Sequence, residues 1–240
     1  MPLFVSTNGI IAPSRNNVKH YLFKKLLTAE EIAVTIHYMR IRVVIVNTES
    51  CAKLLSKPEA FCSAARLEWA ASVNNAQAKL RGYAAELALS FALSGDAMLP
   101  PVYSRDERNK PVISDGFISL SHSGRFAAAA YSPSPVGIDI EELRPVPDRL
   151  SKRILCPAEQ KAFLLGSDEH FLLRRFTEKE AYYKLTGEGV SGGLRRVYAA
   201  EGRVFRDGVM RGFCTRLDGP DRACCLVTRG EPGLIDTVVL

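Results

Sequence analysis

Residues 132–141 read Ser-Pro-Ser-Pro-Val-Gly-Ile-Asp-Ile-Glu and lie near the middle of the 240-residue chain. The first half of this stretch alternates serine with proline, a composition typical of a connection between two structural units. In the second half Val136, Ile138 and Ile140 alternate with other residues, which is the pattern of a half-buried β-strand. The stretch therefore predicts that the chain divides near residue 132 and that a strand opens the second unit.

The same order of elements is predicted on both sides of this connection: one strand, then helices, then paired strands. In the first part these elements cover residues 41–46, 58–76, 80–94, 118–120 and 126–131. In the second part they cover residues 136–141, 148–165, 169–186, 196–206 and 223–228. We therefore expect an α/β fold of the α+β type, with two similar lobes at residues 41–132 and 133–240. Residues 1–40 show little periodicity and are interpreted as an N-terminal extension.

The composition is that of an ordinary globular protein. The chain has 32 Lys and Arg against 26 Asp and Glu, a formal net charge of +6, with 47% hydrophobic and 24% charged residues. This composition excludes a disordered chain, a collagen-like repeat and a disulfide scaffold. A chain of this length can bury roughly 70–75% of its unfolded surface, so we expect any bound metal to be catalytic rather than structural. The basic excess favours an anionic partner.

Targeting and membrane segments are not expected in this sequence. Its first residues lack the charged start and the unbroken apolar run of a secretory signal. No stretch approaches the roughly 18 apolar residues that span a bilayer. The six cysteines show no CxxC pair and no zinc-ligand spacing with histidine, which favours buried thiols in a reducing compartment. We expect a cytoplasmic protein that does not contact a membrane.

Two carboxylates share one face of the strand predicted at residues 136–141. Asp139 and Glu141 are two residues apart, so their side chains project from the same face, about 7 Å apart along the backbone. Neighbouring anions repel, which raises one pKa unless a divalent cation or a basic neighbour compensates. A half-buried strand whose polar face meets water shows the same pattern, so the pair alone leaves both interpretations open.

A second cluster of charged residues lies at residues 176–187, FTEKEAYYKLTG. On a helix Glu180 and Lys184 share a face, whereas Lys179 points about 100° away from Glu180. One carboxylate and one ammonium would thus face a common ligand. A solvated ion pair, or a capping box that begins at Thr177, accounts for the same residues.

Two loops offer cations and hydrogen-bond donors. Residues 119–125 place Ser121 and His122 in a turn between predicted strands, where exposed donors suit phosphate oxygens. We discount a Ser/His catalytic pair, because adjacent residues cannot easily place the hydroxyl against the imidazole nitrogen. In the other loop, Pro111 fixes the chain after Lys110 and favours an extended backbone there. A plain hairpin turn and a plain basic loop are the simpler interpretations.

The order of these motifs is more specific than any one of them. The motifs NKP at 109–111, LSHS at 120–123, GIDIE at 137–141 and FTEKEAYYK at 176–184 together resemble the 4′-phosphopantetheinyl transferase family. The resemblance is to its longer, two-lobed, surfactin-synthetase-activating type and runs from about residue 41 to the last residue. It implies two lobes related by pseudo-twofold symmetry, with coenzyme A and Mg²⁺ bound in the cleft between them. It also implies a monomer, because such a pseudo-dimer closes on itself.

The activity that the resemblance implies is transfer of the 4′-phosphopantetheine arm of coenzyme A to a serine of an apo acyl or peptidyl carrier protein. Adenosine 3′,5′-bisphosphate is the implied product. Asp139, Glu141 and Glu180 are similar to the family's metal ligands, and Glu180 is also similar to its general base. Lys184 resembles the lysine that contacts the pyrophosphate. The other coenzyme A contacts implied by the resemblance are Arg81, Lys110, Ser121, His122 and Lys179.

Two residues depart from the family pattern. Phe176 stands where the family often has tryptophan, which keeps an aromatic side chain at that position. Asn109 replaces the more usual glycine before Lys110, so the geometry of that loop is left open.

Two other functions fit parts of the pattern. A metal-dependent phosphodiesterase or nuclease also uses paired acids with a nearby lysine. Against it, the chain has no extended basic stripe with interleaved aromatic residues, and no nucleic-acid partner is expected. A coenzyme A binding module without turnover would keep the loops but would not need three carboxylates. The sequence does not indicate which carrier protein is the partner.

Overall fold

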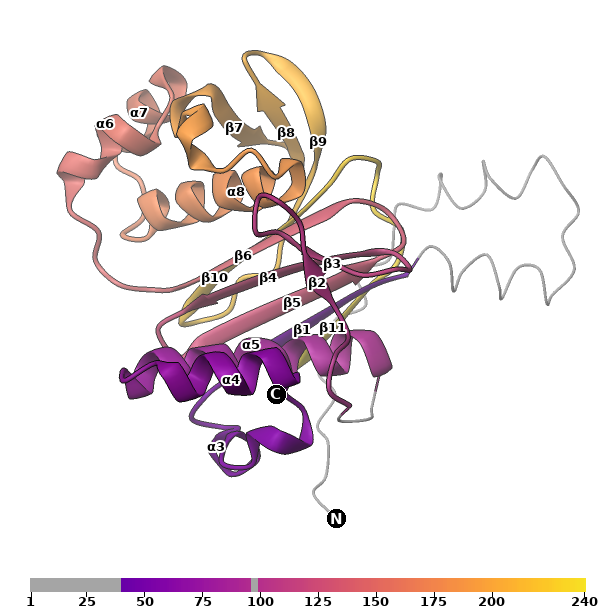
Figure 1. Ribbon diagram of the computed structural model, residues 1–240. Coiled ribbons are helices and arrows are strands. Elements are labelled where there is room, and N and C mark those ends of the chain that lie inside the picture. Colours follow the sequence, from indigo (N-terminus) through magenta and orange to yellow (C-terminus); the bar gives the residue numbers. More distant parts are fainter. Residues whose placement is uncertain (1–39, 96–98) are drawn as a thin grey trace, which may run out of the picture.

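Two β-sheets packed against each other, each with one long helix on its far side, form the framework of the chain (Figure 1). The structure is a computed structural model that describes residues 40–95 and 99–240. The predicted extension at residues 1–40 therefore lies outside the described residues, except for Arg40.

The first sheet has the strand order β11-β1-β5-β4. The strand β1 pairs antiparallel with β5, which pairs antiparallel with β4, whereas β11 runs parallel to β1. The strands of this sheet are β1 Ile41–Asn47, β4 Phe117–Ser123, β5 Phe126–Ser132 and β11 Ile235–Val239. A separate short hairpin consists of β2 Ser104–Arg105 and β3 Pro111–Val112.

The second sheet is antiparallel throughout and has the order β6-β10-β9-β8-β7. Its strands are β6 Val136–Glu142, β7 Val197–Ala200, β8 Arg203–Arg206, β9 Val209–Arg216 and β10 Arg222–Thr228. The strand β6, at one edge of this sheet, contains the alternating residues of the GIDIE motif.

One long helix covers each sheet: α5 Ala76–Ser94 packs on β1 and β5, and α8 Phe171–Thr186 packs on β6 and β10. The shorter helices are α3 Ala52–Leu55, α4 Ala64–Ser72, α6 Ser151–Ile154 and α7 Pro157–Leu164. In the described part of the chain, 3₁₀ turns lie at Pro58–Ala60, Asp148–Leu150, Val190–Gly192 and Leu194–Arg196. Among the described residues, no helix combines the length and the apolar content that a membrane span requires.

The predicted α+β class with two similar lobes is confirmed. The elements β1, α5, β4 and β5 of the first half follow the same order as β6, α8, β9 and β10 of the second. In each half the first strand pairs antiparallel with the last of these strands, which pairs antiparallel with the one before it.

The structure differs from the sequence-based prediction at several elements. The helix predicted at 148–165 is divided into a 3₁₀ turn, α6 and α7, and neither α3 nor the β2–β3 hairpin was predicted. The first predicted helix, at 58–76, becomes a 3₁₀ turn followed by α4, because the Ser63 side chain caps a helix start at Ala64 by accepting the Arg66 N–H at 3.3 Å. The strand β9 was not predicted. The strand β11 was not predicted either, and it pairs with β1, so residues 133–240 also contribute a strand to the sheet of residues 41–132.

Three apolar layers, and a smaller apolar cluster between α6 and α8, hold the described elements together. One lies between α5 and the first sheet, and includes Leu87, Val44 and Ala129. The second lies between the two sheets, where Ile138 and Ile140 of β6 meet residues of β1 and β5. The third lies between α8 and the second sheet. The alternation along β6 thus reflects burial of one strand face against the other half of the chain.

Serine side chains join the two halves where β4 and β6 lie next to each other. Ser119 Oγ accepts a hydrogen bond from the Ile138 N–H at 3.0 Å, and Ser121 Oγ donates to Asp139 Oδ1 at 2.7 Å. Ser123 Oγ donates to Glu141. Successive alternate residues of β4 thus contact successive positions along β6, so the two strands run in the same direction. This seam fixes Asp139 and Glu141 relative to Ser121 and His122, which lie on β4 and not in the predicted turn.

Gly137 allows α8 to approach β6 more closely than any other residue would. A Cβ atom at this position would lie 2.0 Å from Ala181 O and 2.4 Å from Leu185 N, which are backbone atoms of α8. We expect Gly137→Ala to lower the free energy of unfolding by about 1–3 kcal/mol, because the helix must move away from the strand. Chemical denaturation measures this change. Gly230→Ala, where a Cβ meets nothing within 4 Å, is the control, and equal stabilities of the two variants would contradict the close packing.

Candidate functional site

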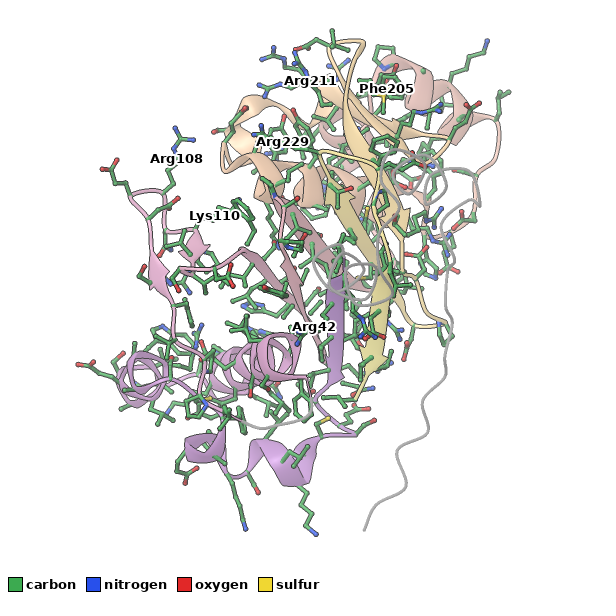
Figure 2. All side chains as sticks on the ribbon, turned by 90° about the vertical axis from the view of Figure 1, so that its right-hand side faces the viewer. Arg42, Arg108, Lys110, Phe205, Arg211 and Arg229 are labelled. Atoms are coloured by element: carbon green, nitrogen blue, oxygen red, sulfur yellow. The ribbon has the colours of Figure 1, made fainter. Side chains whose placement is uncertain are left out.

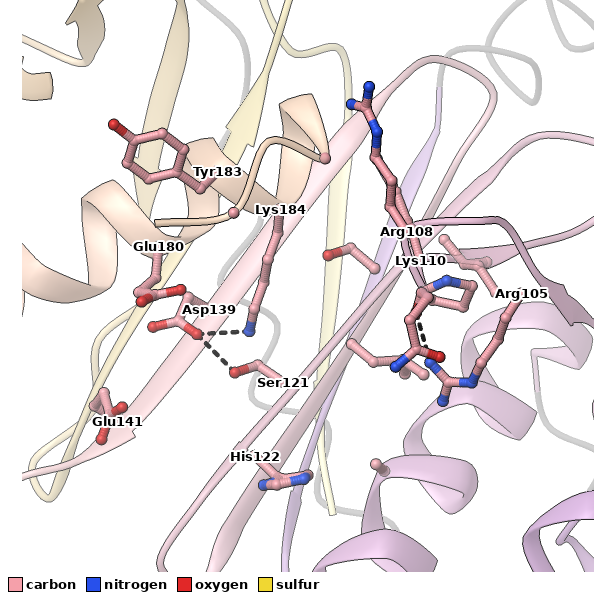
Figure 3. A pocket seen from close by; sticks show the side chains of 18 of the residues that line it. Arg105, Arg108, Lys110, Ser121, His122, Asp139, Glu141, Glu180, Tyr183 and Lys184 are labelled. Atoms are coloured by element: carbon pink, nitrogen blue, oxygen red, sulfur yellow. Dashed lines mark hydrogen bonds and ion pairs between the residues drawn. The ribbon is translucent and has the colours of Figure 1, made fainter. Parts of the chain in front are cut away.

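A cavity of about 500 Å³ opens between the two halves and brings most of the predicted residues together. Figure 3 shows acidic side chains from β6 and α8 on one side and basic side chains of the β2–β3 hairpin on the other. The ionisable residues that line it are Arg66, Arg105, Arg108, Lys110, His122, Asp139, Glu141, Glu180, Tyr183 and Lys184. The polar residues Ser119, Ser121 and Asn109 line it as well.

Asp139 is the buried centre of this cavity, with only 4% of the residue exposed. Its Oδ1 accepts hydrogen bonds from Ser121 Oγ and Lys184 Nζ, both at 2.7 Å (Figure 3). Its Oδ2 is buried and has no hydrogen-bond partner among the described residues. Burial raises the pKa of this carboxyl, while the ammonium of Lys184 acts in the opposite direction. A buried carboxylate oxygen without a partner is unfavourable, so a cation at this point would be stabilised.

Glu180 projects from α8 beside Asp139, one helical turn before Lys184 (Figure 3). Burial is the main factor that raises the pKa of Glu180 to about 7, and the negative charge of Asp139 adds to it. The Lys184 ammonium lowers this pKa only in part. Glu180 and Lys184 share one face of α8, as predicted, and both lie next to the Asp139 carboxylate.

Glu141 lines the cavity but is engaged elsewhere. It accepts a salt bridge from Arg144 Nη1 at 3.0 Å and a hydrogen bond from Ser123 Oγ. Within residues 40–95 and 99–240, no three His, Cys, Asp or Glu side chains are gathered closely enough to hold a metal ion. The structure therefore does not assemble the predicted cluster of three carboxylates.

The donors that are present still fit a divalent cation of the Mg²⁺ type. Magnesium is commonly bound through one or two carboxylates, with waters and substrate phosphates completing its octahedral shell. The unpartnered Oδ2 of Asp139 and the carboxylate of Glu180 supply two such ligands. Glu141 contacts both Arg144 and Ser123 through Oε2, so only its Oε1 would be open to such a cation.

The NKP loop reaches the cavity from the first half. Lys110 Nζ donates to Leu185 O in the last turn of α8 at 3.1 Å, and desolvation lowers the pKa of this ammonium. Asn109 has φ +63°, in the left-handed region that asparagine tolerates better than most residues. Asp106 Oδ1 accepts the N–H groups of Arg108 and Lys110. Asparagine in place of glycine is therefore compatible with the tight turn that directs Lys110 to the cavity.

His122 lies on β4 next to Ser121 and faces several cations. Desolvation lowers the pKa of this imidazole, and the positive charges of Arg81, Lys184 and Arg66 lower it further. A neutral imidazole retains one N–H, so His122 can still donate to a phosphate oxygen. Arg81 itself is not among the residues that line the cavity, although its charge reaches His122.

Lys179 is not part of this site, which corrects its assignment as a coenzyme A contact. Its side chain is fully buried, and its Nζ donates to Ile154 O at 2.7 Å and to Glu159 Oε2 at 2.5 Å. The physical reason is the rotation of about 100° per residue along a helix, which directs Lys179 into the second half while Glu180 faces the cavity. The residue is a structural part of the packing of α6, α7 and α8.

Several cavity residues were missed by reasoning from the sequence, among them Arg66 and Arg105. Arg66 of α4 stacks on the Trp69 ring at 4.7 Å and lies 3.5 Å from a carboxylate oxygen of Glu86. No motif marks it, because it comes from a different helix than the other site residues. Arg105 belongs to β2 of the β2–β3 hairpin. The basic residues that follow it in the sequence were the only feature that could have indicated its place in the site.

Comparisons with known proteins match the part of the chain that carries several of these cavity residues. The model of the 4′-phosphopantetheinyl transferase superfamily matches residues 135–219, which contain Asp139, Glu141, Glu180 and Lys184. The chain is 34% identical over 113 residues to 4′-phosphopantetheinyl transferase psf-1 of Bacillus pumilus, covering 45% of this chain and 47% of that protein. It is 33% identical over 95 residues to 4′-phosphopantetheinyl transferase Sfp of Bacillus subtilis, covering 37% of this chain and 42% of that protein.

A third relative comes from a different group of bacteria. The chain is 36% identical over 101 residues to 4′-phosphopantetheinyl transferase HetI of Nostoc sp., covering 37% of this chain and 43% of that protein. The chain thus spans less than half the length of each of these curated relatives. The similarity of the chain to the 4′-phosphopantetheinyl transferase superfamily thus lies in the segment that supplies Asp139, Glu180 and Lys184 to the cavity.

Proposed function

We propose that the chain transfers the 4′-phosphopantetheine arm of coenzyme A to a serine hydroxyl of an acyl or peptidyl carrier protein. The proposed reaction depends on a divalent cation, for which Mg²⁺ fits, and releases adenosine 3′,5′-bisphosphate. The observation that carries this proposal is Asp139, which holds Lys184 with one oxygen and leaves the other unpartnered beside Glu180. The names of the relatives support the same activity.

The charges of the cavity suit the diphosphate of coenzyme A. Lys110 and His122 from the first half and Lys184 from the second can contact phosphate oxygens from different directions. Arg105 and Arg108 add positive charge at the hairpin side. Binding from several sides fixes the diphosphate for in-line attack, which is the main contribution a protein makes to phosphoryl transfer.

In the proposed step the carrier serine oxygen attacks the phosphorus that bears the pantetheine arm. The new bond joins this oxygen to phosphorus, and the bond from phosphorus to the bridging oxygen breaks. Lys184 stabilises the negative charge that develops on the leaving bisphosphate. A bound divalent cation would neutralise charge on the diphosphate oxygens.

The serine must lose a proton during this step, and the carboxylate of Glu180 in the cavity is suited to accept it. Without a bound cation the pKa of Glu180 is raised to about 7, which is matched to proton transfer near neutral pH. A carboxylate that also binds a cation has a lower pKa and is a weaker base. We therefore propose that the proton passes to Glu180 through a water molecule rather than directly.

The working state that we propose is a monomer in the cytoplasm, without a nucleic-acid or membrane partner. The cavity is enclosed by β4 and the β2–β3 hairpin on one side and by β6 and α8 on the other, all within one chain. A second copy is therefore not needed to complete it.

Intact-mass analysis of an apo carrier protein tests this function. Carriers of the acyl and peptidyl type are incubated with the chain, coenzyme A and Mg²⁺. The expected result is a mass gain of one phosphopantetheine, which is absent when the acceptor serine of the carrier is alanine. Hydrolysis of coenzyme A without carrier modification, or nicking of plasmid DNA, would instead support a phosphodiesterase, and tight binding without turnover would support a binding module.

Divalent cations are expected to stabilise the free protein. Without a cation, the raised pKa of Glu180 means that stability falls as pH rises from the ordinary carboxyl value of 4.5 to about 7, because the unfolded state ionises first. Bound Mg²⁺ would reduce the repulsion between the Asp139 and Glu180 carboxylates, and it competes with the proton for Glu180. The increase in Tm should therefore be larger at pH 8 than at pH 5.5. Each kcal/mol of binding free energy raises Tm by about 2–4 °C. Thermal unfolding measures the effect, and an equal increase in the Asp139→Asn variant would contradict it.

A further inference from the structure

A second cavity, of about 540 Å³, lies on the other side of the C-terminal end of α8. It shares no lining residue with the first cavity, because Tyr182, Leu185 and Thr186 line it whereas Tyr183 and Lys184 line the first. The proposed transfer reaction uses none of its residues. Its volume is within the range of small-molecule sites, roughly 300–1,000 Å³.

Positive charge is in excess around this cavity. Four arginines line it, against the two carboxylates of Glu188 and Asp207; the arginines are Arg196, Arg206, Arg211 and Arg229. Both carboxylates are already paired, Asp207 with Arg196 at 2.5 Å and Glu188 with Arg206. Arg211 and Arg229 form no salt bridge with an acid of the described residues within 4.0 Å. Two guanidinium groups at the cavity are thus available to an external anion.

The backbone is distorted in a way that directs Arg211 to this cavity. Met210 and Arg211 both line it, although neighbouring residues of a regular strand point to opposite faces. The cause is a bulge in the β8–β9 pairing, where Val204 pairs with Gly212 and Phe205 with Met210, so that Arg211 has no opposite residue. Bulges of this kind redirect side chains and are frequent next to functional sites.

The position of Arg229 connects the two cavities electrostatically. Arg229 follows β10 directly, and its positive charge contributes to lowering the pKa of Lys110 in the first cavity. Figure 2 shows Arg211 and Arg229 on the same side of the molecule as Arg108 and Lys110. The positive charges of Arg229 and Lys110 repel each other, and an anion bound at Arg229 would reduce this repulsion.

We propose that this second cavity is a binding site for a small anion that bears phosphate groups. A guanidinium presents a planar pair of N–H donors that matches two phosphate oxygens. Arg211 and Arg229 supply the free donors, Arg196 and Arg206 add charge, and the hollow shape accommodates a compact ligand rather than a flat protein surface. Inorganic diphosphate and the phosphates of a nucleotide share this chemistry.

Titration of the ¹⁵N-labelled full chain by NMR tests the proposal, in a buffer that contains EDTA and no phosphate. Inorganic diphosphate is the first probe and adenosine 5′-monophosphate the second, which distinguishes an inorganic ion from a nucleotide as the better ligand. We expect saturable shifts of the amide signals at residues 206–211 and 229. Signals of Lys110 and Lys184 report the first cavity separately, so loss of binding there would count against the proposed transfer reaction and not against this site.

Arg211→Gln/Arg229→Gln is the decisive variant. It should weaken diphosphate binding at the second cavity by about tenfold or more, as expected for the loss of charge-assisted hydrogen bonds. The control is Arg195→Gln/Arg203→Gln, which removes the same charge from two exposed arginines outside the cavity and should leave binding within about twofold. Shifts confined to the first cavity, or equal affinities of the two double variants, would overturn the proposal. So would shifts caused by a polyglutamate peptide but by neither phosphate probe, which would indicate a protein partner.

Discussion

Asp139→Asn is expected to reduce carrier modification by about 10²–10³-fold without unfolding the protein. Asparagine keeps the size of the side chain and can still accept the Ser121 hydrogen bond. It removes the negative charge that holds the Lys184 ammonium at 2.7 Å and that would bind the cation at Oδ2. Because burial already disfavours this charge, its removal should leave Tm unchanged or raise it. The variant should therefore remain folded but lose activity, which is measured as kcat/KM for the carrier.

Two further variants define what this result means. Glu180→Gln should lower turnover to a comparable extent, because it removes the second carboxylate of the same cluster. Glu142→Gln lies on the same strand outside the cavity and should keep turnover close to that of the wild type. Near-normal carrier modification by Asp139→Asn, with the same amount of folded protein, would show that the cluster around Asp139 does not perform the reaction.

Lys179→Met is expected to lower the free energy of unfolding by about 3–5 kcal/mol, the usual effect of removing one partner from a buried ion pair. The substitution leaves the Glu159 carboxylate buried, with Oε1 unpartnered and Oε2 accepting only the Cys156 N–H. It also removes the donor to Ile154 O. Urea denaturation measures the change.

The matched controls separate this effect from a general loss of lysine. Lys161→Met changes an exposed lysine of α7 and should alter stability by less than about 0.5 kcal/mol. Lys179→Met/Glu159→Gln should recover part of the lost stability, because the unpaired charge is gone. Coenzyme A affinity of the folded Lys179→Met protein should match that of the wild type. Unchanged stability together with weaker coenzyme A binding would restore the assignment of Lys179 to the ligand site.

Short-range patterns made most of the fold predictable. The alternation at Val136, Ile138 and Ile140 predicted β6, and helical spacing up to Gly95 predicted α5. The strand β11 could not be found in this way, because it is parallel to β1 and its pairing joins residues almost 200 positions apart. The strand β9 is interrupted by the bulge at Arg211 and by Gly212, which weaken the alternation that identifies a strand.

Periodicity predicted which site residues share a face, but not what they contact. The i, i+4 spacing of Glu180 and Lys184 correctly placed both on one face of α8. The spacing of Asp139 and Glu141 placed both at the cavity, yet only the structure shows that Lys184 pairs with Asp139 and Arg144 with Glu141. Contacts between side chains of different elements depend on packing, which a single sequence does not specify.

The cavity around Asp139 is where we propose that the diphosphate of coenzyme A binds. The most direct measurement is a crystal structure of the full chain with coenzyme A and Mg²⁺. We expect the diphosphate between Lys110 and Lys184, with the cation on Asp139 and Glu180. A diphosphate that contacts none of these four side chains would contradict this binding site.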